Sequence, residues 1–115
     1  MSTAIDLTGS QEEIEAILAL ARERGEVEEV SEPTALDASR ALNVGLPHVN
    51  PTEALQFITL VFSTGTAALA FFKNLRTFLK DRGATVAASQ TVSGHPLGRI
   101  EASTSDEDLG KIASS

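Results

Sequence analysis

The stretch "ALQFITLVFSTGTAALAFF", from Ala54 to Phe72, decides the fold, because nineteen consecutive residues are uncharged in a chain in which 22% of the residues are charged. The aromatic residues all lie within it or just beyond it: Phe57, Phe62, Phe71, Phe72 and Phe78. Such a run is typical of a membrane span, of an element in a soluble core, or of a surface that binds a partner. The neighbouring residues help to choose between these interpretations.

A helix start signal precedes this stretch. In "NPTE", Asn50 can cap the first free backbone amides, Pro51 suits the first helical position, and Glu53 occupies the third. No clear stop signal follows until Gly83, a residue type that commonly ends helices. We therefore predict one long apolar helix over residues 51–82.

On such a helix the polar and small residues fall on one narrow line, which we call the interaction seam: Gln56, Thr59, Ser63, Thr66 and Ala70. The broad opposite face carries the large apolar residues. Lipid surrounds a membrane span on all sides, so this asymmetry favours a helix packed on a sheet. A membrane-associated helix over 54–72 stays as the alternative. The seam is either covered by other parts of the chain or forms a protein–protein contact.

Three cations form a basic patch near the C-terminal end of the predicted helix: Lys73, Arg76 and Lys80. The helix dipole favours cations at that end, which is sufficient to account for them. The alternative is a contact with an acidic partner or with anionic lipid.

The remaining segments predict short strands and helices. Ser10 and Glu13 form a capping box at the start of a helix that Gly25 ends. The other predicted segments are a strand over Thr3–Leu7, a strand over Glu26–Val30, a connecting loop over 31–50 with one helical turn near Leu36–Leu42, and a hairpin over 84–103. Ser105 with Asp108 allows a short terminal helix, although Gly110 weakens it and residues 110–115 are expected to fray.

This order predicts an α+β fold with two layers. Its elements run strand, helix, strand, loop, long helix, strand, strand, with the helices on one face of a small mixed sheet. At 115 residues the whole chain, 1–115, is the size of one domain.

Composition excludes several classes of function. The chain has no cysteine, which excludes thiol catalysis, zinc–thiolate sites and disulfides. Its net charge of −7 makes nucleic acid an unfavourable partner. The N-terminal sequence "MSTAIDLTGSQEEIE" lacks the basic start and apolar stretch of a secretion signal, so we predict a cytoplasmic protein.

Candidate catalytic residues are few. His48 lies in the proline-containing loop and His95 in the hairpin turn, and a metal site would need both, together with carboxylates at no recognisable spacing. No serine lies in a nucleophile-elbow context. We therefore predict no catalytic residues, no metal site and no cofactor. A small enzyme that uses His48 or His95 is the competing hypothesis.

The segment from Pro51 to Ser103 carries a family resemblance. An uncharged helix with a small-residue centre, "STGTAAL", is followed by "FFKNLRTFLKDRG", then a strand, a glycine turn and a strand. This pattern resembles the bacterial effector-associated constant component family, and residues 3–30 fit the same plan. Many members have tryptophan where this chain has Phe78, and a glycine-richer core where it has "STGT".

The resemblance implies an accessory role. Such proteins are companions of variable effector domains, peptidase-like ones among them, in bacterial conflict systems. No catalytic residue belongs to the family pattern. We therefore predict a non-catalytic adaptor whose partner is a protein effector or a second copy of the chain.

Overall fold

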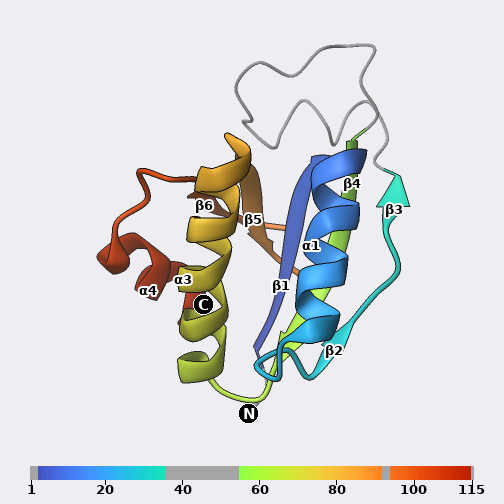
Figure 1. Ribbon diagram of the computed structural model, residues 1–115. Coiled ribbons are helices and arrows are strands. Elements are labelled where there is room, and N and C mark those ends of the chain that lie inside the picture. The colour runs from blue at the N-terminus through green and yellow to red at the C-terminus, as the bar shows by residue number, and fades with distance from the viewer. Residues whose placement is uncertain (1–2, 36–54, 92–93, 115) are drawn as a thin grey trace.

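The computed structural model describes residues 3–35, 55–91 and 94–114 of the chain (Figure 1). In chain order its elements are β1 (Thr3–Ser10), α1 (Gln11–Glu23), β2 (Glu29–Val30), β3 (Thr34–Ala35), β4 (Leu55–Phe62), α3 (Gly65–Arg82), β5 (Val86–Gln90), β6 (Pro96–Ile100) and α4 (Asp106–Ala113). The predicted α+β class is confirmed.

The strands form one sheet in the order β2-β4-β1-β5-β6, with β3 also paired to β4. Every pair is antiparallel, so the prediction of a mixed sheet is wrong. The reason is that β4 lies between β1 and β2, which therefore run in the same direction without pairing. Apart from β3, the elements from β1 to β5 follow the strand–helix–strand–strand–helix–strand order of split β-α-β, ferredoxin-like folds.

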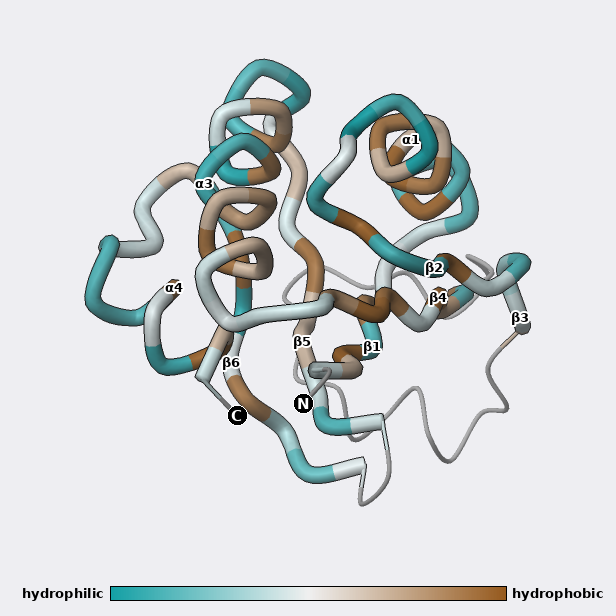
Figure 2. The backbone as a smooth tube through the Cα atoms, turned by 90° about the horizontal axis from the view of Figure 1, so that it is seen from below, coloured by the Kyte–Doolittle hydropathy of each residue, from teal (hydrophilic) through white to brown (hydrophobic). Residues whose placement is uncertain are grey.

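The helices α1 and α3 lie together on one side of the sheet, as Figure 2 shows. On that side the sheet contributes buried residues that include Ile5, Leu7, Ile58, Leu60 and Phe62, and the helices contribute Ile14, Ile17, Phe71, Phe72 and Leu75. Three rings form the centre of this core, because the centroid of Phe62 lies 5.7 Å from that of Phe71 and 5.5 Å from that of Phe72. The helix α4 adds Leu109, Ile112 and Ala113 to the same core.

The prediction of one helix over 51–82 is wrong. Residues 55–62 form the strand β4, Ser63 and Thr64 form a bend, and the helix α3 begins only at Gly65. Thr64 caps this helix, because its side-chain oxygen accepts a hydrogen bond from the Ala67 amide at 3.0 Å. The signal at Asn50–Glu53 lies outside the described residues.

Two features of residues 55–62 explain why they form a strand. Ile58, Leu60 and Phe62 are fully buried while the residues between them are partly exposed, which is the two-residue period of a strand. Paired strands flank β4 on both sides, so an uncharged run there needs no lipid. Within the described ranges, the structure contains no helix with the length and apolarity that crossing a membrane requires.

Several local predictions are confirmed. Ser10 accepts a hydrogen bond from the Glu13 amide at 3.4 Å, and Ser105 accepts one from the Asp108 amide at 3.1 Å, so both caps form. Gly83 ends α3 with a left-handed φ of 64°. The hairpin of β5 and β6 lies within 84–103.

Two predictions about chain segments are corrected. Residues 110–113 do not fray, because α4 continues to Ala113 and buries Ile112 and Ala113 in the core. In the predicted loop 31–50, Thr34 and Ala35 form the strand β3, since they pair with Phe57 and Gln56 of β4. The rest of that loop, with the turn expected near Leu36–Leu42, lies outside the described residues.

Candidate interaction face

The predicted interaction seam does not exist as one surface. Gln56 and Thr59 lie on β4 at positions of opposite parity, so they face opposite sides of the sheet. Ser63 lies in the bend, and Thr66 and Ala70 lie on α3. The prediction placed these five residues on one line by assuming a helix throughout, but residues 55–62 are a strand and α3 begins only at Gly65.

The strand register instead defines a different surface with few charged residues. Because neighbours along a strand alternate between faces, the residues between the core positions point away from α1 and α3. We call this side the second face, and its central residues are Ala4, Asp6 and Thr8 of β1, Phe57, Thr59 and Val61 of β4, and Ala87 and Ser89 of β5. Within the described residues, the helices pack on the other side of the sheet.

Asp6 is the only charged residue among these eight, and it is 6% exposed. Its Oδ1 accepts hydrogen bonds from the Thr59 hydroxyl at 2.6 Å and from the Thr91 hydroxyl at 2.9 Å. A buried carboxylate needs such donors, because an unpaired one would be costly. The sequence offered one signal for this cluster, a single acid between two core residues in "AIDLT".

A groove opens on this face between β2 and β4. It has a volume of about 420 Å³ and is lined by Glu29, Val30, Ser31, Thr59 and Val61. Two hydrogen bonds hold Ser31 against Thr59 in this groove. The Ser31 amide donates to the Thr59 carbonyl at 3.0 Å, and the Thr59 amide donates to the Ser31 hydroxyl at 2.9 Å. The apolar side chain of the groove on this face is that of Val61, because Val30 pairs with Leu60 and packs against the core.

A smaller hollow of about 260 Å³ lies between the end of α3 and residues 101–103. Its one carboxylate, Glu101, accepts hydrogen bonds from the Thr85 hydroxyl at 3.1 Å and the Ser103 hydroxyl at 3.0 Å. These bonds tie the start of β5 to the turn after β6. The carboxylate in the hollow therefore serves to join these two parts of the fold.

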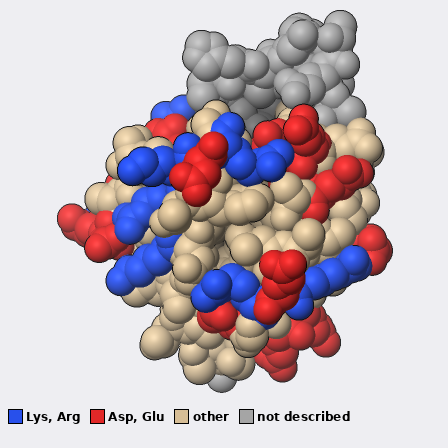
Figure 3. Space-filling model, in the orientation of Figure 1, with Lys and Arg blue, Asp and Glu red and all other residues tan. Residues whose placement is uncertain are grey.

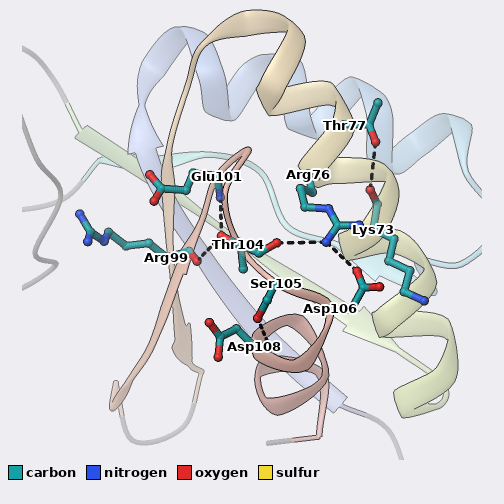
Figure 4. A network of polar contacts seen from close by, with 9 residues as sticks. All are labelled: Lys73, Arg76, Thr77, Arg99, Glu101, Thr104, Ser105, Asp106 and Asp108. Carbon is teal, nitrogen blue, oxygen red and sulfur yellow. Dashed lines mark hydrogen bonds and ion pairs between the residues drawn. The ribbon is translucent and has the colours of Figure 1, made fainter.

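The predicted basic patch lies on α3, where Lys and Arg side chains gather in Figure 3. Arg76 is used within the fold: its Nη1 donates to Asp106 Oδ1 at 2.6 Å and to the Thr104 carbonyl at 3.0 Å (Figure 4). This contact holds the N-terminus of α4 against α3. Lys73 and Lys80 are exposed and make no ion pair within the described residues.

The Arg76 contact changes the acidity of its partner. The hydrogen bond from Arg76, and then its charge, lower the pKa of the Asp106 carboxyl below its ordinary value of 3.8. Lys73 adds a smaller effect in the same direction. Of the three cations in the basic patch, Arg76 therefore serves to hold α4 against α3.

The structure describes one of the two histidines. His95 is exposed beside the turn before β6, and His48 lies outside the described residues. Among the residues that the structure describes, no three His, Asp or Glu side chains are grouped to hold a metal ion.

Comparison of the chain with protein-family models, with curated proteins and with solved structures finds no match.

Proposed function

We infer that this chain is a non-catalytic protein-binding module that docks a protein partner through the second face of its sheet. One observation carries the proposal: the helices pack on one side of the sheet, while the other side presents small, apolar and hydroxyl-bearing side chains. Ala4, Phe57, Thr59, Val61 and Ser89 are all partly exposed there.

The composition of this face fits a protein contact better than a solvated surface. An antiparallel sheet with one face in water usually alternates apolar residues with polar or charged ones. Here the positions that alternate with the core carry no Lys, Arg or Glu among the central eight, and the carboxylate of Asp6 is already hydrogen-bonded. Depletion of charge is also the property that marks the centre of protein interfaces.

The family resemblance indicates the kind of system in which this module works. The segment from Pro51 to Ser103 resembles the effector-associated constant component proteins, which are accessory to effectors in bacterial conflict systems. In that setting the partner is an effector protein, peptidase-like among the candidates, or a second copy of the chain. A cytoplasmic location belongs to the same proposal.

The proposal can be tested with one disruptive variant and one matched control. Val61→Arg places a charge on the second face, in the groove between β2 and β4, whereas Ala19→Arg adds the same charge at an exposed position of α1. Both variants, checked for folding by circular dichroism, are crosslinked in the cells that make the protein. Loss of the crosslinked partner in Val61→Arg alone supports the proposal, and equal crosslinking in both contradicts it.

A further inference from the structure

The groove between β2 and β4 lies at an outer edge of the sheet. β2 is the terminal strand in the order β2-β4-β1-β5-β6, and no described strand lies beyond it (Figure 1). The volume of the groove, about 420 Å³, falls within the range of pockets that bind small molecules, which is ample for one long side chain. A partner that docks on the second face therefore meets a recess at this edge.

Negative charge is concentrated along the same edge. Residues 26–35 contain no lysine or arginine and four glutamates: Glu26, Glu28, Glu29 and Glu32. The Arg22 guanidinium neutralises Glu32, with 2.8 Å between Nη2 and Oε1. Arg24 neutralises Glu26 in the same way, at 2.6 Å. Glu28 and Glu29 are exposed and form no ion pair with any residue that the structure describes, so their charges stay uncompensated there.

Glu29 is the one charged residue that lines the groove. It is the register partner of Val61, and side chains that lie directly opposite one another on paired strands point to the same face. The hydroxyls in the groove are already used within the fold, because Ser31 accepts from the Thr59 amide and the Thr59 hydroxyl donates to Asp6. The groove therefore offers a ligand one carboxylate, that of Glu29, beside the apolar side chain of Val61.

We propose that this groove receives a basic side chain, arginine or lysine, from the protein that docks on the second face. The inference rests on the proposed function and deepens it by stating the chemistry of the partner. The stem of the basic side chain lies on Val61, and its cation meets the carboxylate of Glu29. Long basic side chains combine these two contacts, since their stems are apolar and only their ends are charged. An acidic side chain in the same place would be repelled.

This contact fixes the orientation of the partner more than it adds to the affinity. Glu29 is exposed, and a pair of exposed charges contributes little and is screened by salt. The central residues of the second face include no Lys, Arg or Glu, so they do not favour one orientation through charge. A charge at one edge determines which part of the partner lies over β2, because rim charges suppress the wrong arrangements.

The test uses two short peptides that differ only at one central residue, which is arginine in one and glutamine in the other. Each peptide is titrated into the isotope-labelled protein, and the backbone amide signals in NMR spectra report where it binds. The arginine peptide should bind with a dissociation constant on the order of 1 mM and shift the amides of the residues that line the groove. The glutamine peptide should bind about three-fold more weakly.

Two matched variants locate the charge that is responsible. Glu29→Gln removes the charge and keeps the shape of the side chain, so it should weaken binding of the arginine peptide about three-fold and leave binding of the glutamine peptide unchanged. Glu15→Gln makes the same change at an exposed position of α1 and should have no effect. Equal binding of the arginine peptide to the two variants overturns the inference, and so do shifts that are confined to the helix layer.

Crosslinking in the cells that make the protein separates this inference from the proposed function. Glu29→Arg should lose the partner that Val61→Arg loses, while Glu15→Arg should keep it, provided that circular dichroism shows all three to be folded. Loss in Val61→Arg alone overturns the inference and leaves the proposed function standing. Equal crosslinking of Val61→Arg and Ala19→Arg contradicts the proposed function, and the peptide titration then decides by itself whether the groove binds a basic side chain.

Discussion

Thr59 donates its hydroxyl to the Asp6 carboxylate at 2.6 Å, across the pair of strands that forms the middle of the sheet. The two residues lie 53 positions apart in the chain and are direct register partners. A shift of β1 by one residue would turn Asp6 toward the core, and a shift of β4 by one residue would turn Thr59 there, so either shift would break this hydrogen bond. The hydrogen bond therefore reports the register on which the whole second face depends.

Removal of the acceptor should destabilise the protein. Asp6→Ala leaves the hydroxyls of Thr59 and Thr91 without their common partner, and we expect a loss of about 1–3 kcal/mol in the free energy of unfolding. Asp6→Asn keeps an acceptor oxygen and should cost less than the alanine variant. Urea denaturation measures both, and an alanine variant as stable as the original protein would show that the network is dispensable.

The two faces of β4 should respond differently to truncation. Phe62 is fully buried among the rings of Phe71 and Phe72, so Phe62→Ala should cost about 3–5 kcal/mol. Phe57 lies on the second face and is only partly buried, so Phe57→Ala should cost about 1 kcal/mol. Thermal unfolding of the two variants checks this difference. Equal losses would contradict the two-residue period of β4.

The start of α3 should depend on Thr64. Its side-chain oxygen accepts from the Ala67 amide, so Thr64→Ala should cost about 1 kcal/mol, while Thr64→Ser should retain most of the stability. Thr66→Ala, at an exposed position inside the helix, is the matched control and should change little. If Thr64→Ala is as stable as the control, the helix does not begin where the structure places it.

The contact between Arg76 and Asp106 should make stability depend on pH. The pKa of Asp106 is lower in the folded state than its ordinary value of 3.8, because Arg76 stabilises the ionised form. The stabilisation is therefore present above pH 3.8 and is lost as the pH falls through the lowered folded pKa. Asp106→Asn should be less stable than the original protein at pH 7, and this difference should shrink at pH 2.5.

The control for that experiment is Glu107→Gln, which removes a neighbouring exposed charge that is not bonded to Arg76. Its stability difference from the original protein should change less between the two pH values. An Asp106→Asn difference that is constant from pH 7 to pH 2.5 would mean that the ion pair contributes nothing to folding.

Features that depend on residues close together in the chain could be predicted from the sequence, and features that depend on distant residues could not. The caps at Ser10 and Ser105 depend on residues three positions away, and both were predicted correctly. Residues 55–62 were assigned to the wrong element, because an uncharged apolar run fits a buried helix or a buried strand equally well. What makes them a strand is pairing with β1, about fifty residues earlier, which no local pattern reveals.

The candidate site residues, too, could be predicted only where interactions between nearby residues decide their positions. The interaction seam was drawn with a helical period across residues that lie on a strand, a bend and a helix, so only Thr59 belongs to the second face. Lys73, Arg76 and Lys80 were placed correctly on one helix, but the use of Arg76 to hold α4 depends on Asp106, thirty residues later. Asp6 was missed because its partners are Thr59 of β4 and Thr91, the residue that follows β5.

The central claim, that the second face binds a protein surface, is tested most directly by crosslinking the original protein, Val61→Arg and Ala19→Arg in the cells that make the protein. The account predicts the same crosslinked partner for the original protein and for Ala19→Arg, and its loss in a folded Val61→Arg variant. A Val61→Arg variant that is crosslinked as strongly as Ala19→Arg would contradict it.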